Sequence, residues 1–141
     1  MGDCWLLGAL QSLSVKDLKK LVYFDGLEFG FCVIQIYFRS EWKSIMVDTR
    51  IPCFKDRPAY GRNTDSRQFL VAMIEKAFSK SRGSYESLNG GNTAEAMVDL
   101  TGGISKKINL NAATVDDLFW RMLKSELDAK NLIGCAYIKR N

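Results

Sequence analysis

The chain has 141 residues, of which 47% are hydrophobic, with 20 basic and 16 acidic residues, a formal net charge of +4 and no histidine. This length and apolar content suit one folded domain with its own core and exclude a disordered tail. The charges are spread without a basic tract, so no nucleic-acid partner is indicated. No apolar run is long enough to span a bilayer and we expect no signal peptide, which makes a cytoplasmic location the expectation.

Four cysteines and the absence of histidine limit the chemistry of these residues. The cysteines form no Cys-x-x-Cys pair, and a Cys/His zinc site is excluded, so no metal site is predicted. Reduced thiols are the expected state, although the even number leaves a disulfide framework open. A mechanism that needs imidazole as a general base cannot be completed by this chain alone. The cysteines are Cys4, Cys32, Cys53 and Cys135.

Local patterning predicts two helices and a β-hairpin in the first half of the chain. One helix follows Asp3, which is expected to cap it, and a second begins at the capping sequence Ser14-Val-Lys-Asp17. β-Branched and aromatic residues predict strands over 31–38 and 42–47, joined by a turn at 39–41. The stretch 52–65 contains both prolines and is expected to be an irregular surface loop.

The second half of the chain predicts three helices and a final strand. One helix is expected from near Ser66 to Gly83, and a short one from a cap at Thr93 to Leu100. A third begins at Thr114, and its inner side is expected to carry Leu118, Phe119, Met122, Leu123 and Leu127. Residues 131–139 predict a strand with no partner strand after it. We therefore expect a sequence truncated within a larger fold.

Cys4 is the first candidate for chemistry. A thiol just inside a helix N-terminus has its thiolate stabilised by unsatisfied backbone N–H groups and by the positive end of the helix dipole. Gly2 allows a tight turn and close approach of a substrate, and Trp5 could form one wall of a site. The alternative is a half-buried packing cysteine of an amphipathic helix, which position alone favours.

The residues around Cys4 resemble a known enzyme family. The segment Gly2-Asp3-Cys4-Trp5-Leu6-Leu7-Gly8-Ala9-Leu10 is similar to the nucleophile segment of the calpain family of cysteine proteases. Asp48-Thr-Arg50-Ile-Pro52 looks like the end of the family's hairpin strand, Asp-x-Arg-Leu-Pro. Three further segments match in the same order: the central helix and its exit, a Gly-Gly segment leading to an Asp-x-Thr-Gly-Gly terminator, and a strand containing Leu-x-Gly-Cys. They are residues 69–88, 89–103 and 132–135.

The resemblance implies an α+β fold, the first subdomain of a papain-like core. Its nucleophile helix would lie at the N-terminus and its central helices would pack with a β-hairpin. Residues 1–130 would form the nucleophile subdomain, and residues 131–141 would be the entry strand of a truncated second subdomain. Cys4 matches the nucleophile, and its backbone N–H would contribute to the oxyanion hole. Gly91, with its neighbour Gly90, matches the segment that binds extended substrate; Trp5 matches a cleft-side tryptophan, with packing beneath the helix equally consistent.

Several features of the family pattern are missing from these residues. The family's catalytic histidine lies in a Gly-His-Ala-Tyr segment and its asparagine in Asn-Pro-Trp, and neither segment occurs. Gly134-Cys135-Ala136-Tyr137 resembles the first only superficially, because chain order aligns it with the earlier Leu-Gly-Cys strand. The oxyanion-hole glutamine would precede the first residue. Calcium is possible by family resemblance, but Gln68 stands where the family has a ligand glutamate, so the residues of this chain do not support it.

The resulting expectation is a calcium-dependent-type cysteine endopeptidase, with Cys4 attacking peptide bonds of intracellular proteins. The 141 residues alone are predicted to be inactive, and the missing second catalytic subdomain is a possible partner, brought by the same or a second polypeptide. The alternative is a non-catalytic calpain-like protein that binds peptides or a partner. The remaining acidic residues are expected to be solvated or to cap helices, with an Asp48–Arg50 pair at the hairpin end; among them are Glu75, Glu86 and Asp99.

Overall fold

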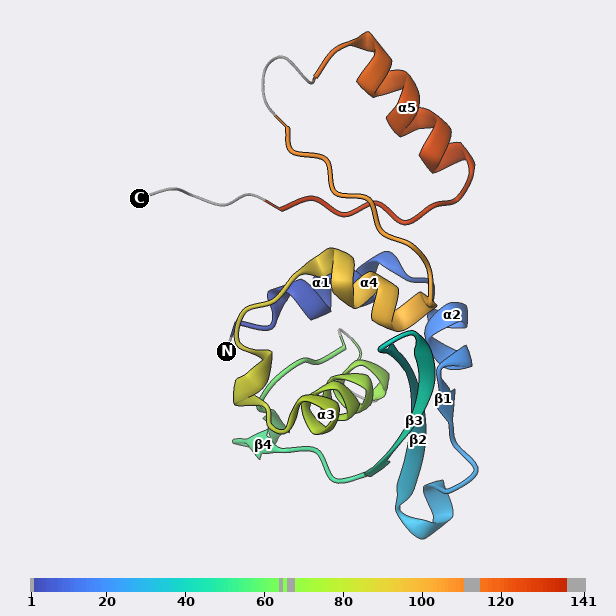
Figure 1. Cartoon of the computed structure of the whole chain (residues 1–141). Coiled ribbons are helices and arrows are strands. Elements are labelled where there is room, and N and C mark those ends of the chain that lie inside the picture. The colour runs from blue at the N-terminus through green and yellow to red at the C-terminus, as the bar shows by residue number, and fades with distance from the viewer. Residues whose placement is uncertain (1, 64, 66–67, 111–114, 137–141) are drawn as a thin grey trace.

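The computed structural model describes residues 2–63, 65, 68–110 and 115–136 (Figure 1). These residues contain helices and small antiparallel sheets, which confirms the predicted α+β class. None of the helices in the described ranges is long and apolar enough to cross a membrane. The elements in chain order are α1 (Cys4–Ser12), α2 (Val15–Lys20), β1 (Val22–Tyr23), a 3₁₀ turn (Leu27–Phe29), β2 (Phe31–Phe38), β3 (Glu41–Asp48), β4 (Cys53–Phe54), β5 (Arg57–Pro58), α3 (Leu70–Arg82), a second 3₁₀ turn (Glu86–Leu88), α4 (Thr93–Thr101) and α5 (Asp117–Asp128).

The main sheet has the order β1-β2-β3, and one of its faces carries the core. Alternation along β2 places Cys32, Ile34 and Ile36 in the interior, where Cys32 is paired with Val47 of β3. Helix α3 packs against β3, α4 against β2, and α1 against α4 (Figure 1). Because α1 packs against both α4 and α3, its start is held close to the segment that leads into α4.

Local signals set most helix boundaries. Ser14 caps α2 as predicted, since its hydroxyl accepts a hydrogen bond from the Asp17 N–H at 3.1 Å. The cap of α4 is Asn92 and not Thr93, because the Asn92 side chain already accepts from the Ala94 N–H at 2.9 Å. Helix α3 begins at Leu70, later than predicted, and the predicted start at Ser66 lies outside the described residues.

The predicted hairpin is present with a shorter turn. Arg39 and Ser40 both have positive φ, 54° and 66°, which matches a two-residue loop of the type that follows the twist of the strands. Glu41 is therefore not part of the turn but pairs with Phe38 as the first residue of β3. Tyr37 and Trp42 form a cross-strand aromatic pair with ring centroids 5.4 Å apart.

The stretch 52–65 is more regular than predicted. Residues Lys55 and Asp56 have φ of 49° and 59° and join β4 to β5 in a second small hairpin. Pro58 is tolerated there because an edge position does not require its missing N–H. Strand β1, paired with β2 at Val22 and Tyr23, was also not predicted, because two residues are too few to show a period.

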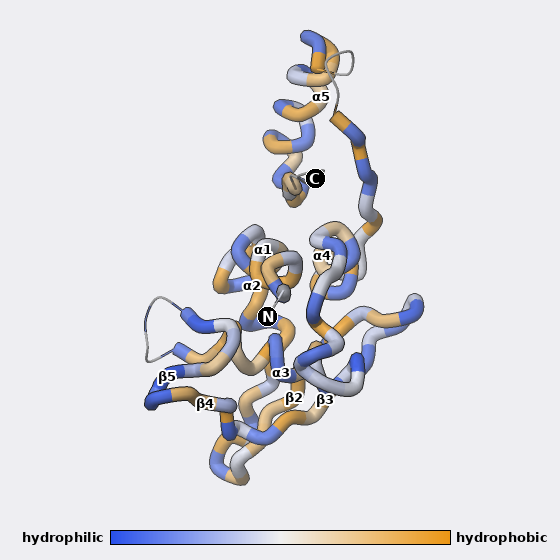
Figure 2. The backbone as a smooth tube through the Cα atoms, turned by 90° about the vertical axis from the view of Figure 1, so that its left-hand side faces the viewer, coloured by the Kyte–Doolittle hydropathy of each residue, from blue (hydrophilic) through white to orange (hydrophobic). Residues whose placement is uncertain are grey.

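The C-terminal prediction is only partly correct. Helix α5 forms, with the Asp116 side chain accepting from the Phe119 N–H at 2.8 Å, while the proposed cap Thr114 lies outside the described residues. The predicted inner face is only partly covered: Phe119, Met122 and Leu123 are half-buried, whereas Leu118 and Leu127 are 73% and 54% exposed. Figures 1 and 2 both show α5 standing apart from the other helices. The colours of Figure 2 show hydrophobic and hydrophilic residues mixed along it.

The predicted final strand is not present over residues 131–136, and residues 137–139 lie outside the described part of the chain. A strand needs a partner for its backbone groups, and no described strand pairs with this segment. The assignment of residues 1–130 and 131–141 to two subdomains stays a prediction.

Candidate active site

Cys4 is the first residue of α1, and its side chain is exposed. The first N–H groups of a helix have no intrahelical acceptor, so they and the helix dipole create a positive potential at this thiol. The N-cap position belongs to Asp3, as predicted, but the Asp3 side chain makes no capping hydrogen bond. Asp3 is instead buried, 8% exposed, and its carboxyl lies beside that of Glu75 in α3.

The segment that leads into α4 is attached to the residues around Cys4. The Gly2 N–H donates to the Asn89 side-chain oxygen at 2.9 Å, and the Gly90 N–H donates to the Gly2 carbonyl at 2.8 Å. The Trp5 indole N–H donates to the Leu88 carbonyl at 2.9 Å within the core. Three hydrogen bonds between residues more than eighty positions apart therefore hold residues 88–90 beside the nucleophile candidate.

Gly90 and Gly91 are exposed, and both occupy positions where a residue with a Cβ atom would be strained. Gly90 has a φ of +81°, a left-handed conformation that L side chains adopt at a cost. At Gly91 a Cβ atom would lie 2.3 Å from the Trp5 ring, so its backbone runs directly against the indole. The structure thus brings together Cys4, Trp5, Gly90 and Gly91, the four site residues predicted from the sequence.

Trp5 is part of the core and not of an open wall. Its side chain is only 4% exposed, and Arg82 of α3 lies over the indole with its guanidinium carbon 4.9 Å from the ring centroid. Arg82 also pairs with Asp99 of α4 at 3.3 Å, which corrects the expectation that Asp99 is solvated or a cap. Burial raises the pKa of Asp99, and the Arg82 charge opposes that rise. Direct contact of Trp5 with a substrate stays a prediction.

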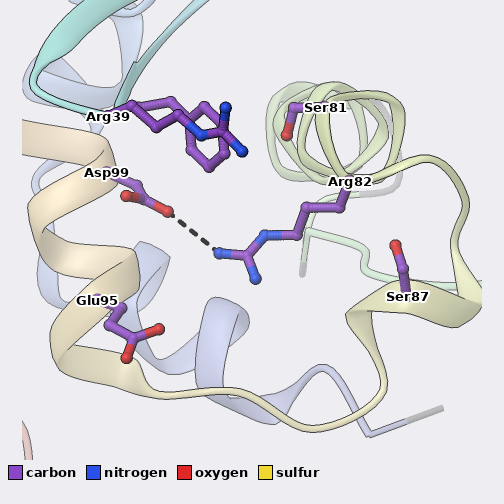
Figure 3. Close-up of a pocket in the computed structure, with 7 residues that line it drawn as sticks. Arg39, Ser81, Arg82, Ser87, Glu95 and Asp99 are labelled. Carbon is purple, nitrogen blue, oxygen red and sulfur yellow. Dashed lines mark hydrogen bonds and ion pairs between the residues drawn. The ribbon is translucent and has the colours of Figure 1, made fainter.

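A pocket of about 560 Å³ lies next to Arg82, and neither Cys4 nor Gly91 lines it. Figure 3 shows the Arg82 guanidinium pointing across it to Asp99. Its charged side chains carry both signs, so it has no clear preference for one class of ligand. The lining residues are Phe38, Arg39, Ser81, Arg82, Ser87, Glu95 and Asp99.

Glu75 of α3 is the second corrected acidic residue. It was expected on a solvated face but is 1% exposed. One carboxyl oxygen, Oε2, accepts from the Gly61 N–H at 2.8 Å. Burial, together with the Asp3 carboxyl, raises the pKa of Glu75 to about 8. Sequence pattern missed it because Glu75 stands next to Lys76 in a helix whose charged residues look solvent-facing.

Sequence pattern also carried no signal for the supporting residues Asn89 and Arg82. Their contacts, with Gly2 and with Trp5 and Asp99, join segments distant in the chain. Only the resemblance of residues 89–103 to the calpain family suggested that this region would lie near Cys4. Chemically, the arrangement offers a thiol and helix N–H donors for a developing oxyanion, but no imidazole occurs in the sequence.

The described residues do not offer a donor set that fits calcium. No group of three or more histidine, cysteine, aspartate or glutamate side chains in these ranges is arranged to hold a metal ion. Gln68 is exposed and supplies one neutral amide oxygen, whereas calcium takes roughly six to eight oxygens, several of them from carboxylates. No step of the chemistry below is therefore derived through calcium.

The chain is similar to calpains along its whole length. The sequence profile described as Calpain family cysteine protease matches residues 1–141. Calpain-9 of Mus musculus is 39% identical over 142 residues, which cover 96% of this chain and 20% of that protein. Calpain-9 of Homo sapiens is 37% identical and the Calpain-1 catalytic subunit of Homo sapiens 35%, with the same coverage. The chain spans about a fifth of the length of these curated relatives. With the family profile matched throughout, the chain belongs to the calpain family of cysteine proteases.

Proposed function

We propose that these residues supply the nucleophile part of a calpain-type cysteine endopeptidase that cleaves intracellular proteins in the cytoplasm. The observation that carries this proposal is the exposed Cys4 thiol at the first residue of α1, beside the exposed Gly90–Gly91 backbone. A helix start favours the thiolate, and the thiolate is the nucleophile in cysteine proteases. The match to the calpain family is the second support.

In the proposed reaction the Cys4 Sγ attacks the carbonyl carbon of the scissile peptide. The carbonyl oxygen gains negative charge, which the Cys4 N–H at the helix start stabilises. As the C–N bond breaks, the leaving amine takes a proton from a general acid and an acyl-enzyme remains, which water then hydrolyses. Because the 141 residues contain no histidine, an imidazole acid and base has to come from residues outside them.

The Gly90–Gly91 segment is proposed to bind the substrate main chain. Without Cβ atoms on these residues, an extended peptide can approach closely enough for backbone hydrogen bonds. The hydrogen bond from the Gly90 N–H to the Gly2 carbonyl fixes this segment relative to the residues just before Cys4. Binding and chemistry would then share one rigid unit.

A peptidase assay with cysteine variants tests the proposal. The 141-residue chain alone should show no turnover of a peptide substrate, because no residue in it replaces imidazole. The full-length natural protein should cut the same peptide, and Cys4→Ser should abolish that activity. Cys53→Ser is the matched control, since Cys53 is also an exposed free thiol, and it should leave turnover unchanged. Turnover that survives Cys4→Ser would refute the assignment of Cys4.

The absence of histidine also favours a second candidate, a calpain-like protein that binds peptides or a partner without cutting them. The coding sequence beyond Asn141 distinguishes the two. Gly-His-Ala-Tyr and Asn-Pro-Trp segments in the same reading frame support the protease. A stop codon there supports the binding protein, unless a second polypeptide that restores Cys4-dependent activity co-purifies with the chain.

A further inference from the structure

Two carboxyl groups lie in the interior immediately behind the Cys4 nucleophile candidate. Asp3, the residue before Cys4, is 8% exposed, and Glu75 of α3 is 1% exposed. The two side chains come from the N-cap of α1 and from α3, and they are close enough for a direct carboxyl–carboxyl hydrogen bond. Neither side chain caps a helix or forms an ion pair at the surface. Their burial side by side therefore needs another explanation.

The hydrogen bonds of Glu75 leave one of its oxygens without a donor. Oε2 accepts from the Gly61 N–H, but Oε1, which is shielded from solvent, has no hydrogen-bond partner among the described residues. Two ionised carboxylates have no proton to share and repel each other. A proton on Glu75 changes this, because the protonated carboxyl then donates to the Asp3 carboxylate. Burying an unsatisfied polar oxygen is costly, so the protonated pair is the favoured state.

The groups around Glu75 support the neutral form. Asp3 faces it from α1, and Tyr85 faces it from the segment after α3, with Tyr60 stacked on Tyr85 at 4.2 Å. Burial and then the Glu75 charge raise the pKa of Tyr85 to about 12, so the phenol stays neutral. No lysine or arginine in the described ranges pairs with Glu75; Lys76, its neighbour, is bonded to Asp48.

From this geometry we propose that Glu75 is a positioning residue for the nucleophile: its carboxyl proton bridges to Asp3 and fixes the start of α1, and so the place of Cys4. The inference rests on the proposed role of Cys4. It predicts that the geometry around Cys4 is lost at alkaline pH, when Glu75 becomes ionised. When Glu75 loses the proton, two carboxylates face each other beneath the first turn of α1. Their repulsion displaces this turn and so moves the Cys4 thiol relative to the helix N–H groups beside it.

The pH at which this happens follows from the pKa of Glu75, which burial and Asp3 raise to about 8. An acid whose folded-state pKa lies above its unfolded value binds more protons when folded. Folding stability therefore falls as the pH rises from the ordinary glutamate range through about 8. Glu75→Gln removes this dependence, since its amide N–H₂ donates to Asp3 and its oxygen accepts from Gly61 at every pH.

The first test measures the rate at which iodoacetamide alkylates Cys4 in the full chain between about pH 6.5 and pH 9.5. Wild type and Glu75→Gln should react alike at the lower end. At the upper end the variant should react at least about threefold faster, with the divergence centred near pH 8. Glu86→Gln, which changes an exposed glutamate away from the pair, should follow the wild-type profile. A ratio of rates that is constant with pH would overturn the proposal.

The second test observes Glu75 directly and does not depend on Cys4 or on turnover. The ¹³C chemical shift of the Glu75 carboxyl should titrate near pH 8 in the wild-type chain. In Asp3→Asn the opposing charge is gone and the introduced amide can donate to Glu75, so the midpoint should fall toward the ordinary glutamate range. An ordinary midpoint in the wild type would overturn the shared proton. Failure of the peptidase assay with both tests positive would instead refute the proposed function and leave the carboxyl pair intact.

Discussion

Gly91 shows most directly how single residues determine the geometry of the site. Its backbone lies so close to the Trp5 indole that a Cβ would be 2.3 Å from the ring. Trp5 is held in place, because its N–H is bonded to the Leu88 carbonyl and Arg82 lies over its ring. Any side chain at position 91 must therefore displace either α1 or the segment that carries Gly90.

Replacing Gly91 by alanine should destabilise the chain by about 1–3 kcal/mol, because an added methyl group in a filled space forces side chains and backbone apart. The loss is measured as a lower midpoint of urea unfolding at an unchanged slope. Gly8→Ala in α1 is the control: the nearest atom to its Cβ is Thr93 Cγ2 at 3.9 Å, an ordinary contact. That variant should be neutral or more stable, by up to about 1 kcal/mol, because alanine favours helix. Equal losses in both would contradict the steric argument.

At the scale of elements, Lys76 joins helix α3 to the end of strand β3. Its ammonium donates to the Asp48 carbonyl at 3.1 Å and to the Arg50 carbonyl, and it pairs with the Asp48 carboxylate at 2.9 Å. The predicted Asp48–Arg50 pair is present at 3.3 Å but is the longer of the two contacts. The pKa of Asp48 is lowered to about 2, mainly by the hydrogen bond from the Lys76 side chain and secondly by the one from the Arg50 N–H.

Lys76→Met should remove part of the acid sensitivity of folding. Because the folded-state pKa of Asp48 is depressed, its contribution to stability is present above about pH 4 and is lost as the pH falls toward 2. Asp48 is partly exposed, so after solvent screening the contribution is on the order of 1 kcal/mol. Lys76→Met should lose that amount near neutral pH and show a shallower stability profile between about pH 4 and pH 2, as followed by urea unfolding. Lys80→Met, which removes only a bond to the Met46 carbonyl, should keep the steep acid profile.

The same scale separates what sequence reasoning could find from what it missed. Helix α2 was correctly predicted because Ser14 and Asp17 carry its start signal within four residues, and the hairpin because β-branched residues run through both strands. Glu75 and the contact face of α5 depend on what other elements place beside them. For Glu75 that is Asp3 at the start of α1, and for α5 the described residues leave Leu118 and Leu127 exposed. The spacing of hydrophobic residues along the sequence predicts a helix, but it does not show which other elements will lie against that helix.

In the candidate site, too, some residues could be predicted from the sequence and others could not. The resemblance of residues 2–10 and 89–103 to the calpain family pointed to Cys4, Gly90 and Gly91, and the structure shows that these residues lie together. The burial of Trp5, the Asn89 bond to Gly2 and the Asp3–Glu75 pair depend on contacts between residues more than seventy positions apart. Composition and spacing contain no information on such contacts, which tertiary packing alone creates.

At the scale of the whole molecule, the core is confined to one part of the chain. All buried hydrophobic residues of the described ranges lie between Trp5 and Leu100. After Gly102 the chain continues through exposed residues 103–110 to α5 and then passes α4, where Gly134 lies against Met97. The segments after residue 103 thus contribute little of the burial that stabilises the fold.

Limited trypsin digestion of the full chain should first cut after Lys106 or Lys107. These residues are exposed in a segment without helix or strand, whereas cleavage at Lys43 or Lys76 requires part of β3 or α3 to open. The product that ends at residue 106 or 107 retains every hydrophobic residue that is buried in the described ranges. It should resist further digestion of its core, as mass spectrometry would show. Replacing both lysines by glutamine should delay the first cut while leaving the core equally resistant. Early fragments that begin at residue 44 or 77 would show that the core opens as readily as the segment that follows it.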